Sequence, residues 1–314
     1  MSFNHIIGHE QIKSCIVNSI RENKLSHAHI FAGEKGIGKS LLAKELAVQV
    51  LGGNHDKKYV DIVEYSVPLN KKSIGVDNVR EIIEEVNKKP YEGDKKVIII
   101  NNASEMTEAA QNAFLKTIEE PPKGVFIILL CENLGNILDT IKSRCQVHKL
   151  QGLSRLEMKS FINKKLNIYN EEKVKAAISF SDGIPGRAES FINDEQLKVI
   201  RDHCLIILKG INEESKDDFL KNDLFFVKFK DQWQEVLTCL ISYIRDIMVY
   251  KDTNSRDLII NADKINEIKS LSENFSFNKL NGIVNIINES REKIERNVNA
   301  ALIFDSLLIK MQEV

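Results

Sequence analysis

The segment "GEKGIGKS" at residues 33–40 constrains the fold of this chain more than any other feature of its sequence. It fits the pattern G-x-x-x-x-G-K-[ST] in full, in which glycines let backbone N–H groups surround a phosphate. It follows the short apolar segment 29–32 and precedes residues 40–50, where apolar side chains recur every four residues. This order predicts a buried strand, a phosphate-binding loop and a helix that begins at the loop.

Five residues of the loop are expected to hold the phosphates of a nucleotide. The three glycines are Gly33, Gly36 and Gly38, whose backbone would wrap the anion. Lys39 would reach the outer phosphates, and Ser40 would ligate a Mg²⁺ ion that arrives with the nucleotide. The alternative interpretation is a glycine-rich turn that meets this pattern by chance.

The first half of the chain alternates between strand-like and helix-like segments. Helices are expected at 40–50, 76–90 and 107–120, and strands at 29–32, 96–100 and 125–130. Such alternation predicts an α/β domain over residues 1–150, with a mostly parallel sheet and helices on both faces.

The pattern changes after about residue 150, where strand-like segments end. Short helical segments at 154–166, 171–181 and 187–193 predict a small helical domain over 151–195. Longer helical patterns then predict an all-helical domain over 196–314. Its expected apolar positions are Trp233, Val236, Leu237, Leu240, Ile241, Ile244, Ile247, Met248, Leu280, Ile283, Val284, Ile287, Leu302, Leu307 and Leu308. Spacing does not separate a core position from one that packs on another subunit.

Two amides stand where a nucleotide hydrolase of this layout carries acids. The buried strand that lines such a site normally ends in carboxylates, which hold Mg²⁺ and activate water. Here Asn101 and Asn102 follow residues 97–100. An amide is uncharged and a poor base, so the sequence predicts a phosphate site that does not turn over. The alternative is that another acid, Asp94 or Glu105, replaces them.

Composition excludes several other classes of protein. The net charge of the 314 residues is -1, so the isolated chain has no basic field that would favour nucleic acid. Five scattered cysteines form no C-x-x-C pair, which argues against a disulfide framework or a zinc site and favours a reducing cytoplasm. Residues 1–10 lack the apolar core of a signal peptide, and the longest apolar run, 125–131, is too short to span a membrane.

Several segments together resemble the clamp-loader branch of the AAA+ proteins. They are "LSHAHIFAGEKGIGKS" at 25–40, "QNAFLKTIEEPP" at 111–122, "ILLCENLGNILDTIKSRCQ" at 128–146 and "NVNAALIFDSLLIKM" at 297–311. The resemblance covers essentially the whole chain. It implies a RecA-like P-loop domain (1–150), a helical lid (151–195) and a helical collar (196–314) that holds a five-subunit ring together. Such rings load a sliding clamp onto primed DNA.

The resemblance also assigns roles to single residues. It implies that Arg144, in "SRC", projects into the ATP site of the neighbouring subunit as an arginine finger. Asn133 matches a polar sensor on the strand beside the P-loop, and Arg187 matches a sensor in the lid. Residues 5–10 resemble a segment that packs near adenine. Taken alone, Arg144 would be a surface arginine, Asn133 a turn former and Arg187 a loop cap.

Two departures from the family pattern point to a non-motor member. The stretch 51–70 has no cysteine, where many members insert a four-cysteine zinc module, so no zinc is predicted. The acids are also absent, so ATP would be bound weakly or structurally. The implied partners are the motor (gamma/tau) and delta subunits, and through the complex the sliding clamp and primed DNA. The alternatives are an active motor ATPase of the clamp loader and an AAA+ adaptor outside replication.

Overall fold

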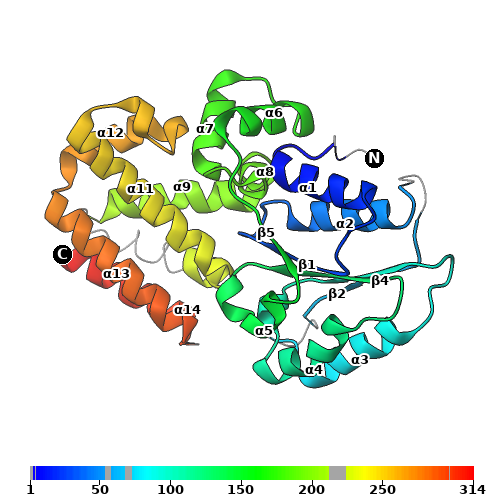
Figure 1. Cartoon of the computed structure of the whole chain (residues 1–314). Helices are drawn as coiled ribbons and strands as arrows, with labels where there is room; N and C mark the ends of the chain where they lie inside the picture. Colours follow the sequence, from blue (N-terminus) through cyan, green and yellow to red (C-terminus); the bar gives the residue numbers. More distant parts are fainter. Residues whose placement is uncertain (1–2, 4, 54–57, 68–72, 212–223, 297) are drawn as a thin grey trace. The chain divides into compact units, whose positions relative to one another are not determined.

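The computed structural model describes residues 3, 5–53, 58–67, 73–211, 224–296 and 298–314. The chain forms two compact units (Figure 1). The first contains residues 1–161 and 183–186, and the second contains 162–182 and 187–314. The predicted division into three domains stays a prediction.

The first unit is built on a five-stranded parallel sheet with the strand order β2-β3-β4-β1-β5. Its strands are β1 (Ala28–Ala32), β2 (Ile62–Tyr65), β3 (Lys96–Ile100), β4 (Val125–Cys131) and β5 (Gln146–Lys149). Both β1 and β3 are buried along their whole length. The predicted strands at 29–32, 96–100 and 125–130 are therefore confirmed, and β2 and β5 are added to them.

Helices cover both faces of this sheet, as the alternating pattern predicts. In the first unit they are α1 (Glu10–Arg21), α2 (Lys39–Val50), α3 (Val76–Asn87), α4 (Glu108–Glu119) and α5 (Asp139–Lys142). Figure 1 shows α1 and α2 on one side of the sheet and α3 and α4 on the other. Strand β3 serves both cores, because Ile98 and Ile100 join one apolar cluster while Val97 and Ile99 join the other.

Helix α6 (Arg155–Lys165) has residues in both units. The remaining helices belong to the second unit, except that residues 185–186 at the start of α8 belong to the first. They are α7 (Glu171–Ser181), α8 (Pro185–Asn193), α9 (Glu195–Gly210), α11 (Trp233–Thr253), α12 (Ile265–Asn274), α13 (Phe277–Glu295) and α14 (Ala300–Glu313). One large apolar cluster joins α9 to α14. The predicted core positions on α11 and α13 are buried or partly buried in it. Leu302 is the exception: it is 64% exposed, because α14 turns its 303, 304, 307 and 308 face inward.

A buried arginine joins the short helices of the second unit to the longer ones. Arg201 of α9 is 5% exposed, and its Nη2 donates to Asn261 Oδ1 (3.2 Å) and to both oxygens of Asp263 (2.9 and 3.1 Å). Its guanidinium lies 4.5 Å from the ring centre of Phe191 on α8 and 5.4 Å from that of Phe180 on α7. Two aromatic rings and two polar side chains therefore hold this cation, although its buried Nε has no hydrogen-bond partner among the described residues.

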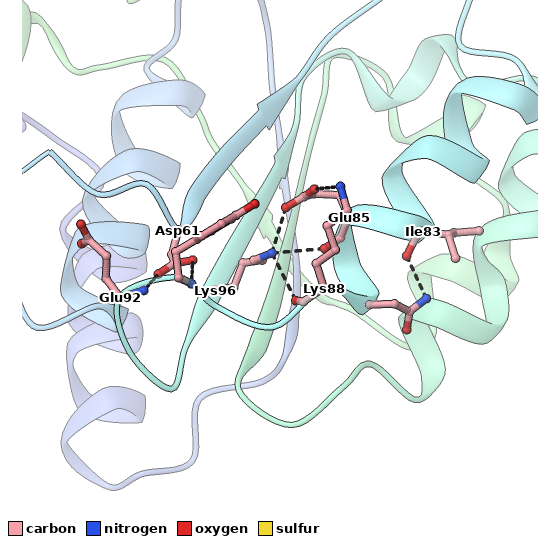
Figure 2. A network of polar contacts seen from close by, with 8 residues as sticks. Asp61, Ile83, Glu85, Lys88, Glu92 and Lys96 are labelled. Carbon is pink, nitrogen blue, oxygen red and sulfur yellow. Dashed lines mark hydrogen bonds and ion pairs between the residues drawn. The ribbon is translucent and has the colours of Figure 1, made fainter.

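A buried lysine anchors helix α3 to the start of strand β3 (Figure 2). Lys96 Nζ contacts Glu85 Oε1 at 2.8 Å and also donates to the carbonyls of Glu85 (3.3 Å) and Lys88 (3.2 Å). These carbonyls end α3, where a cation is favourable. Nearby, the buried Asp61 accepts from the backbone N–H groups of Tyr91 (2.7 Å) and Glu92 (2.9 Å). The network fixes the amino end of β3, whereas the phosphate loop follows the carboxyl end of β1.

Two buried histidines form a second polar contact inside the sheet. His29 of β1 and His148 of β5 lie 3.1 Å apart between Nδ1 and Nε2. His29 Nε2 donates to the carbonyl of Ser26 (2.9 Å), so His29 Nδ1 must be the acceptor and His148 Nε2 the donor. Burial lowers the pKa of each histidine to about 4, and at His29 the neighbouring His148 adds to this effect.

This pair predicts a loss of stability in weak acid. An unfolded histidine binds a proton near pH 6.5, but the folded ones resist it until about pH 4. The unfolded state therefore holds more protons between these values, and the free energy of unfolding falls as the pH is lowered through this window. Urea unfolding from pH 7 to pH 4.5 should show a shallower acid slope for His148→Phe than for the natural chain. Identical slopes would contradict this assignment.

Candidate phosphate site and arginine turn

The loop at 33–40 has the shape that its glycines predict. It leaves β1 at Ala32 and enters α2 at Lys39. Gly36 and Gly38 have φ values of 84° and 109°, which residues with a Cβ rarely adopt. The predicted order of strand, loop and helix is confirmed, and the amino end of α2 supplies the partial positive charge that a phosphate requires.

The carbonyl side of the loop is held by donors from the chain itself. Lys39 Nζ donates to the carbonyls of Gly33 (2.6 Å) and Glu34 (2.9 Å). The carbonyl of Gly36 accepts from the N–H of Gly186 at 3.0 Å, and a Cβ at Gly186 would meet the Gly36 Cα at 2.8 Å. His9 Nε2 lies 3.2 Å from the carbonyl of Ile37, to which it donates. These contacts within the chain support the conformation of the loop.

His9 comes from the segment 5–10, which resembles a family segment that packs near adenine. The residue adopts a left-handed conformation at the start of α1, which turns its ring toward the loop. Burial lowers the pKa of His9, so the ring is neutral and can donate through Nε2. The segment thus contacts the phosphate loop directly.

The carboxyl end of β3 carries the two amides expected from the sequence. The N–H of Asn101 donates to the carbonyl of Tyr65 (2.7 Å), and Asn102 has a φ of 52°. Of the alternative acids, Asp94 precedes β3 and lies at its amino end, away from the loop. Glu105 ends the short 3-10 helix η1 (Ala103–Glu105) that follows the amides. Of these two alternative acids, Glu105 alone lies beyond the carboxyl end of β3, where the acids of a hydrolase would be.

An acid that sequence reasoning did not single out lies closer to the loop. Glu132 follows β4, which pairs directly with β1, and the N–H of Gly33 donates to the carbonyl of Cys131 (3.2 Å). Burial lowers the pKa of Lys39, and the negative charge of Glu132 is the largest influence that opposes this shift. The pairing of β4 with β1 brings Glu132 to the loop, because the carboxyl ends of neighbouring parallel strands lie on the same side of a sheet. The sequence pattern alone does not predict which strands are neighbours.

The predicted sensor Asn133 follows Glu132 in the same loop. Its Oδ1 accepts from the N–H of Gly135 at 2.8 Å and caps the 3-10 helix η2 (Leu134–Asn136). Arg187 lies on α8 in the second unit, whereas the phosphate loop lies in the first. The roles of both residues toward a nucleotide stay predictions.

Arg144 lies on the turn between α5 and β5. Its Nη1 donates to the carbonyl of Thr140 (3.0 Å), and its Nε and Nη2 face the two carboxylate oxygens of Glu119 at 3.3 and 3.4 Å. Its side chain is 36% exposed. The next residue, Cys145, has a thiol whose pKa burial raises to about 12, so it is not a nucleophile at neutral pH.

A buried glutamine positions the segment that leads to Arg144. Gln111 of α4 donates through Nε2 to the carbonyls of Met106 (3.1 Å) and Asn136 (2.8 Å), and its Oε1 accepts from the N–H of Leu138 (2.8 Å). One side chain therefore links the residues after β3, helix α4 and the residues before α5. The sequence pattern gave this glutamine no role.

Among the described residues, no group of three or more histidine, cysteine or acidic side chains is arranged to hold a metal ion. Within the same ranges, no helix has the length and apolar character that crossing a membrane requires. The stretch 51–70, which lacks the cysteines of a zinc module, lies in part (54–57 and 68–70) outside the described residues.

Two family models match the chain and together cover most of it. The model described as DNA polymerase III, delta subunit, matches residues 8–154. The model described as DNA polymerase III, delta subunit, C terminal, matches residues 200–313.

Individual relatives agree with these matches. The chain is 26% identical to DNA polymerase III subunit delta' of Bacillus subtilis, with 96% of each protein covered. It is 24% identical to DNA polymerase III subunit tau of the same organism, covering 98% of this chain but only 61% of the tau subunit. A solved gamma subunit-related protein of Thermotoga maritima shares the fold, with a TM-score of 0.52, 18% identity, and coverage of 95% of this chain and 98% of that one.

Replacing Gln111 by alanine should destabilise the first unit by about 2 kcal/mol, because buried carbonyl and N–H groups lose their partners. Hydrogen exchange should also accelerate at residues 136–144, where the arginine turn loses its support. Asn112→Ala, an exposed change on the same helix, is the matched control and should cost less than about 0.5 kcal/mol. Equal exchange rates in the two variants would show that Gln111 does not position this turn.

Proposed function

The chain belongs to the delta-subunit family of DNA polymerase III, and from that premise we propose that it is the delta-prime subunit of a bacterial clamp loader. The delta' relative of Bacillus subtilis matches over nearly the whole of both chains, whereas the chain spans only 61% of the tau subunit. As a delta-prime subunit it takes part in DNA replication by helping to load the sliding clamp on primed DNA.

The chain's own phosphate site suits binding without hydrolysis. The glycine conformations and Lys39 fit a phosphate, and Ser40 would ligate the Mg²⁺ that accompanies the nucleotide. The loop residues would bind a nucleotide through its phosphates. The carboxyl end of β3 offers Asn101 and Asn102, which neither carry charge to Mg²⁺ nor accept a proton from water. We therefore propose weak or structural ATP binding and no turnover.

In this proposal the chain contributes the guanidinium of Arg144 to catalysis in a neighbouring subunit. A guanidinium keeps its charge at any physiological pH and can bind two phosphate oxygens at once. The residue is partly exposed on a short turn that Gln111 supports through the segment before α5. This is the observation that carries the proposal that Arg144 enters the ATP site of a neighbouring motor subunit and stabilises charge as the γ-phosphate is transferred.

The implied partners follow from this role. The chain would assemble with the motor (gamma/tau) and delta subunits through its helical second unit. It would reach the clamp and primed DNA only through the complex, and contacts with DNA would be made to backbone phosphates. No structural zinc is part of this proposal.

One observation favours a second candidate, an active ATPase. The charge of Glu132 acts on Lys39 and therefore lies near the loop where a nucleotide would bind. A carboxylate there could serve as the base that β3 lacks. ATP hydrolysis by the purified chain that is abolished separately by Lys39→Ala and Glu132→Gln would establish this alternative.

We expect Arg144→Ala to leave the chain folded and to reduce the DNA-stimulated ATP hydrolysis of the reconstituted loader at least about tenfold, because one transition-state cation is lost. Arg80→Ala is the matched control, since Arg80 is also exposed and pairs with a carboxylate, Asp77, at 3.1 Å. The steady-state rate of phosphate release measures both. Undiminished hydrolysis with Arg144→Ala would rule out the finger.

We also expect no catalytic turnover of ATP by the isolated chain, because its site lacks a base and a Mg²⁺-binding carboxylate at β3. The measurement is phosphate release at saturating ATP and Mg²⁺, with Lys39→Ala as the background. Turnover well above that background would refute the proposal of an inactive site.

A further inference from the structure

The guanidinium of Arg144 is already largely occupied within its own chain. Nε and Nη2 face Glu119, while Nη1 donates to the carbonyl of Thr140 (3.0 Å) and to Ser143 Oγ (3.4 Å). A guanidinium carries its five N–H groups on three nitrogens, and each of the three nitrogens of Arg144 lies near an oxygen of its own chain.

The edge that Glu119 occupies is the one a phosphate requires. Carboxylates and phosphates both bind arginine through two parallel N–H···O bonds to the same fork. The fork formed by Nε and Nη2 faces both oxygens of Glu119. A phosphate can therefore take this edge only if the carboxylate leaves it.

We propose that Glu119 is a positioning residue that restrains Arg144, and that the finger acts only after a neighbour's phosphate replaces the Glu119 carboxylate. This inference rests on the proposed function of Arg144. It concerns the control of that arginine, and it adds a residue for which neither the sequence pattern nor the fold gave a role.

The place of Glu119 in the fold explains why the restraint is present. Glu119 is the last residue of α4, and a carboxylate at the carboxyl end of a helix is unfavourable unless a cation lies beside it. Arg144 supplies that cation, together with Lys116 in the last turn of the same helix. Gln111 ties α4 to the segment before α5, so the distance between the two charged residues is fixed by the fold.

The restraint is weak enough to be released. Glu119 is 55% exposed and Arg144 36% exposed, and exposed ion pairs of this kind shift an equilibrium by a factor of about two to five. A γ-phosphate carries more charge than a carboxylate, so the exchange favours the phosphate once a neighbour presents it. The ion pair thus lowers the fraction of Arg144 that is available to a phosphate without preventing the exchange.

The test is Glu119→Gln in the loader reconstituted with its motor and delta subunits. The amide keeps the shape of the side chain but loses its charge, so the kcat/KM for DNA-stimulated ATP hydrolysis should rise about two- to fivefold. Glu119→Ala should act in the same direction. Glu120→Gln changes the adjacent exposed acid, which forms no hydrogen bond or ion pair with Arg144 in the described part of the chain, and should leave kcat/KM unchanged.

Combining the same changes with Arg144→Ala completes a double-mutant cycle. There Glu119→Gln should have no effect, because the group that it releases is absent. An unchanged or reduced kcat/KM for Glu119→Gln with Arg144 present, while Arg144→Ala is defective, would overturn the restraint and leave the finger intact. A normal rate for Arg144→Ala would instead overturn the proposed function. The unfolding midpoint of each variant should match the natural chain within about 2 °C.

Discussion

The parallel pairing of β1 with β4 is the interaction on which the site depends. It aligns Ala32 with Cys131, and the N–H of Gly33 continues the ladder to the Cys131 carbonyl at 3.2 Å. This register brings the start of the phosphate loop beside the residues after β4. Glu132 thereby comes within electrostatic reach of Lys39, although 93 positions separate them in the chain. The order of the strands decides which side chains lie near the phosphate loop. Strand β4 lies between β1 and β3, so Glu132 after β4 lies next to the loop, and the amides after β3 lie one strand further away.

The phosphate loop keeps its shape for reasons that are independent of catalysis. Its carbonyls accept from Lys39, from the ring of His9 and from the N–H of Gly186. These donors come from α2, from the start of α1 and from residues 183–186, so the loop is the place where distant segments of the first unit meet. A loop with this architectural role would be retained even if nucleotide turnover were lost. Replacement of Gly36 would be costly in either case, because its φ is 84° and the Gly186 backbone lies against it.

The sequence alone predicted the elements whose pattern is strong. Strands β3 and β4 contain continuous apolar runs. The helix expected at 107–120 is α4, and the Oγ1 of its N-cap Thr107 accepts from the N–H of Ala110 at 3.2 Å. Strands β2 and β5 were missed because they are short edge strands with polar residues and only partial burial. The pairing of Arg144 with Glu119 joins residues that are 25 positions apart, so no local sequence pattern predicts it. Leu302 was expected among the apolar positions of the helical domain, but apolar character does not reveal whether such a position faces the core or the surface.

Two arginines in this chain show how burial separates a structural cation from an available one. Arg201 is 5% exposed and is held by Asn261, Asp263 and two aromatic rings, so removing it from these contacts would leave buried groups without partners. Arg144 is 36% exposed, and its single counter-charge is itself mostly in solvent. Water can replace that carboxylate at little cost, because both partners of the ion pair are partly exposed. The same chemical group therefore stabilises the fold from a buried position in the second unit, while in the first it lies partly exposed on a turn, in an ion pair that solvent reaches.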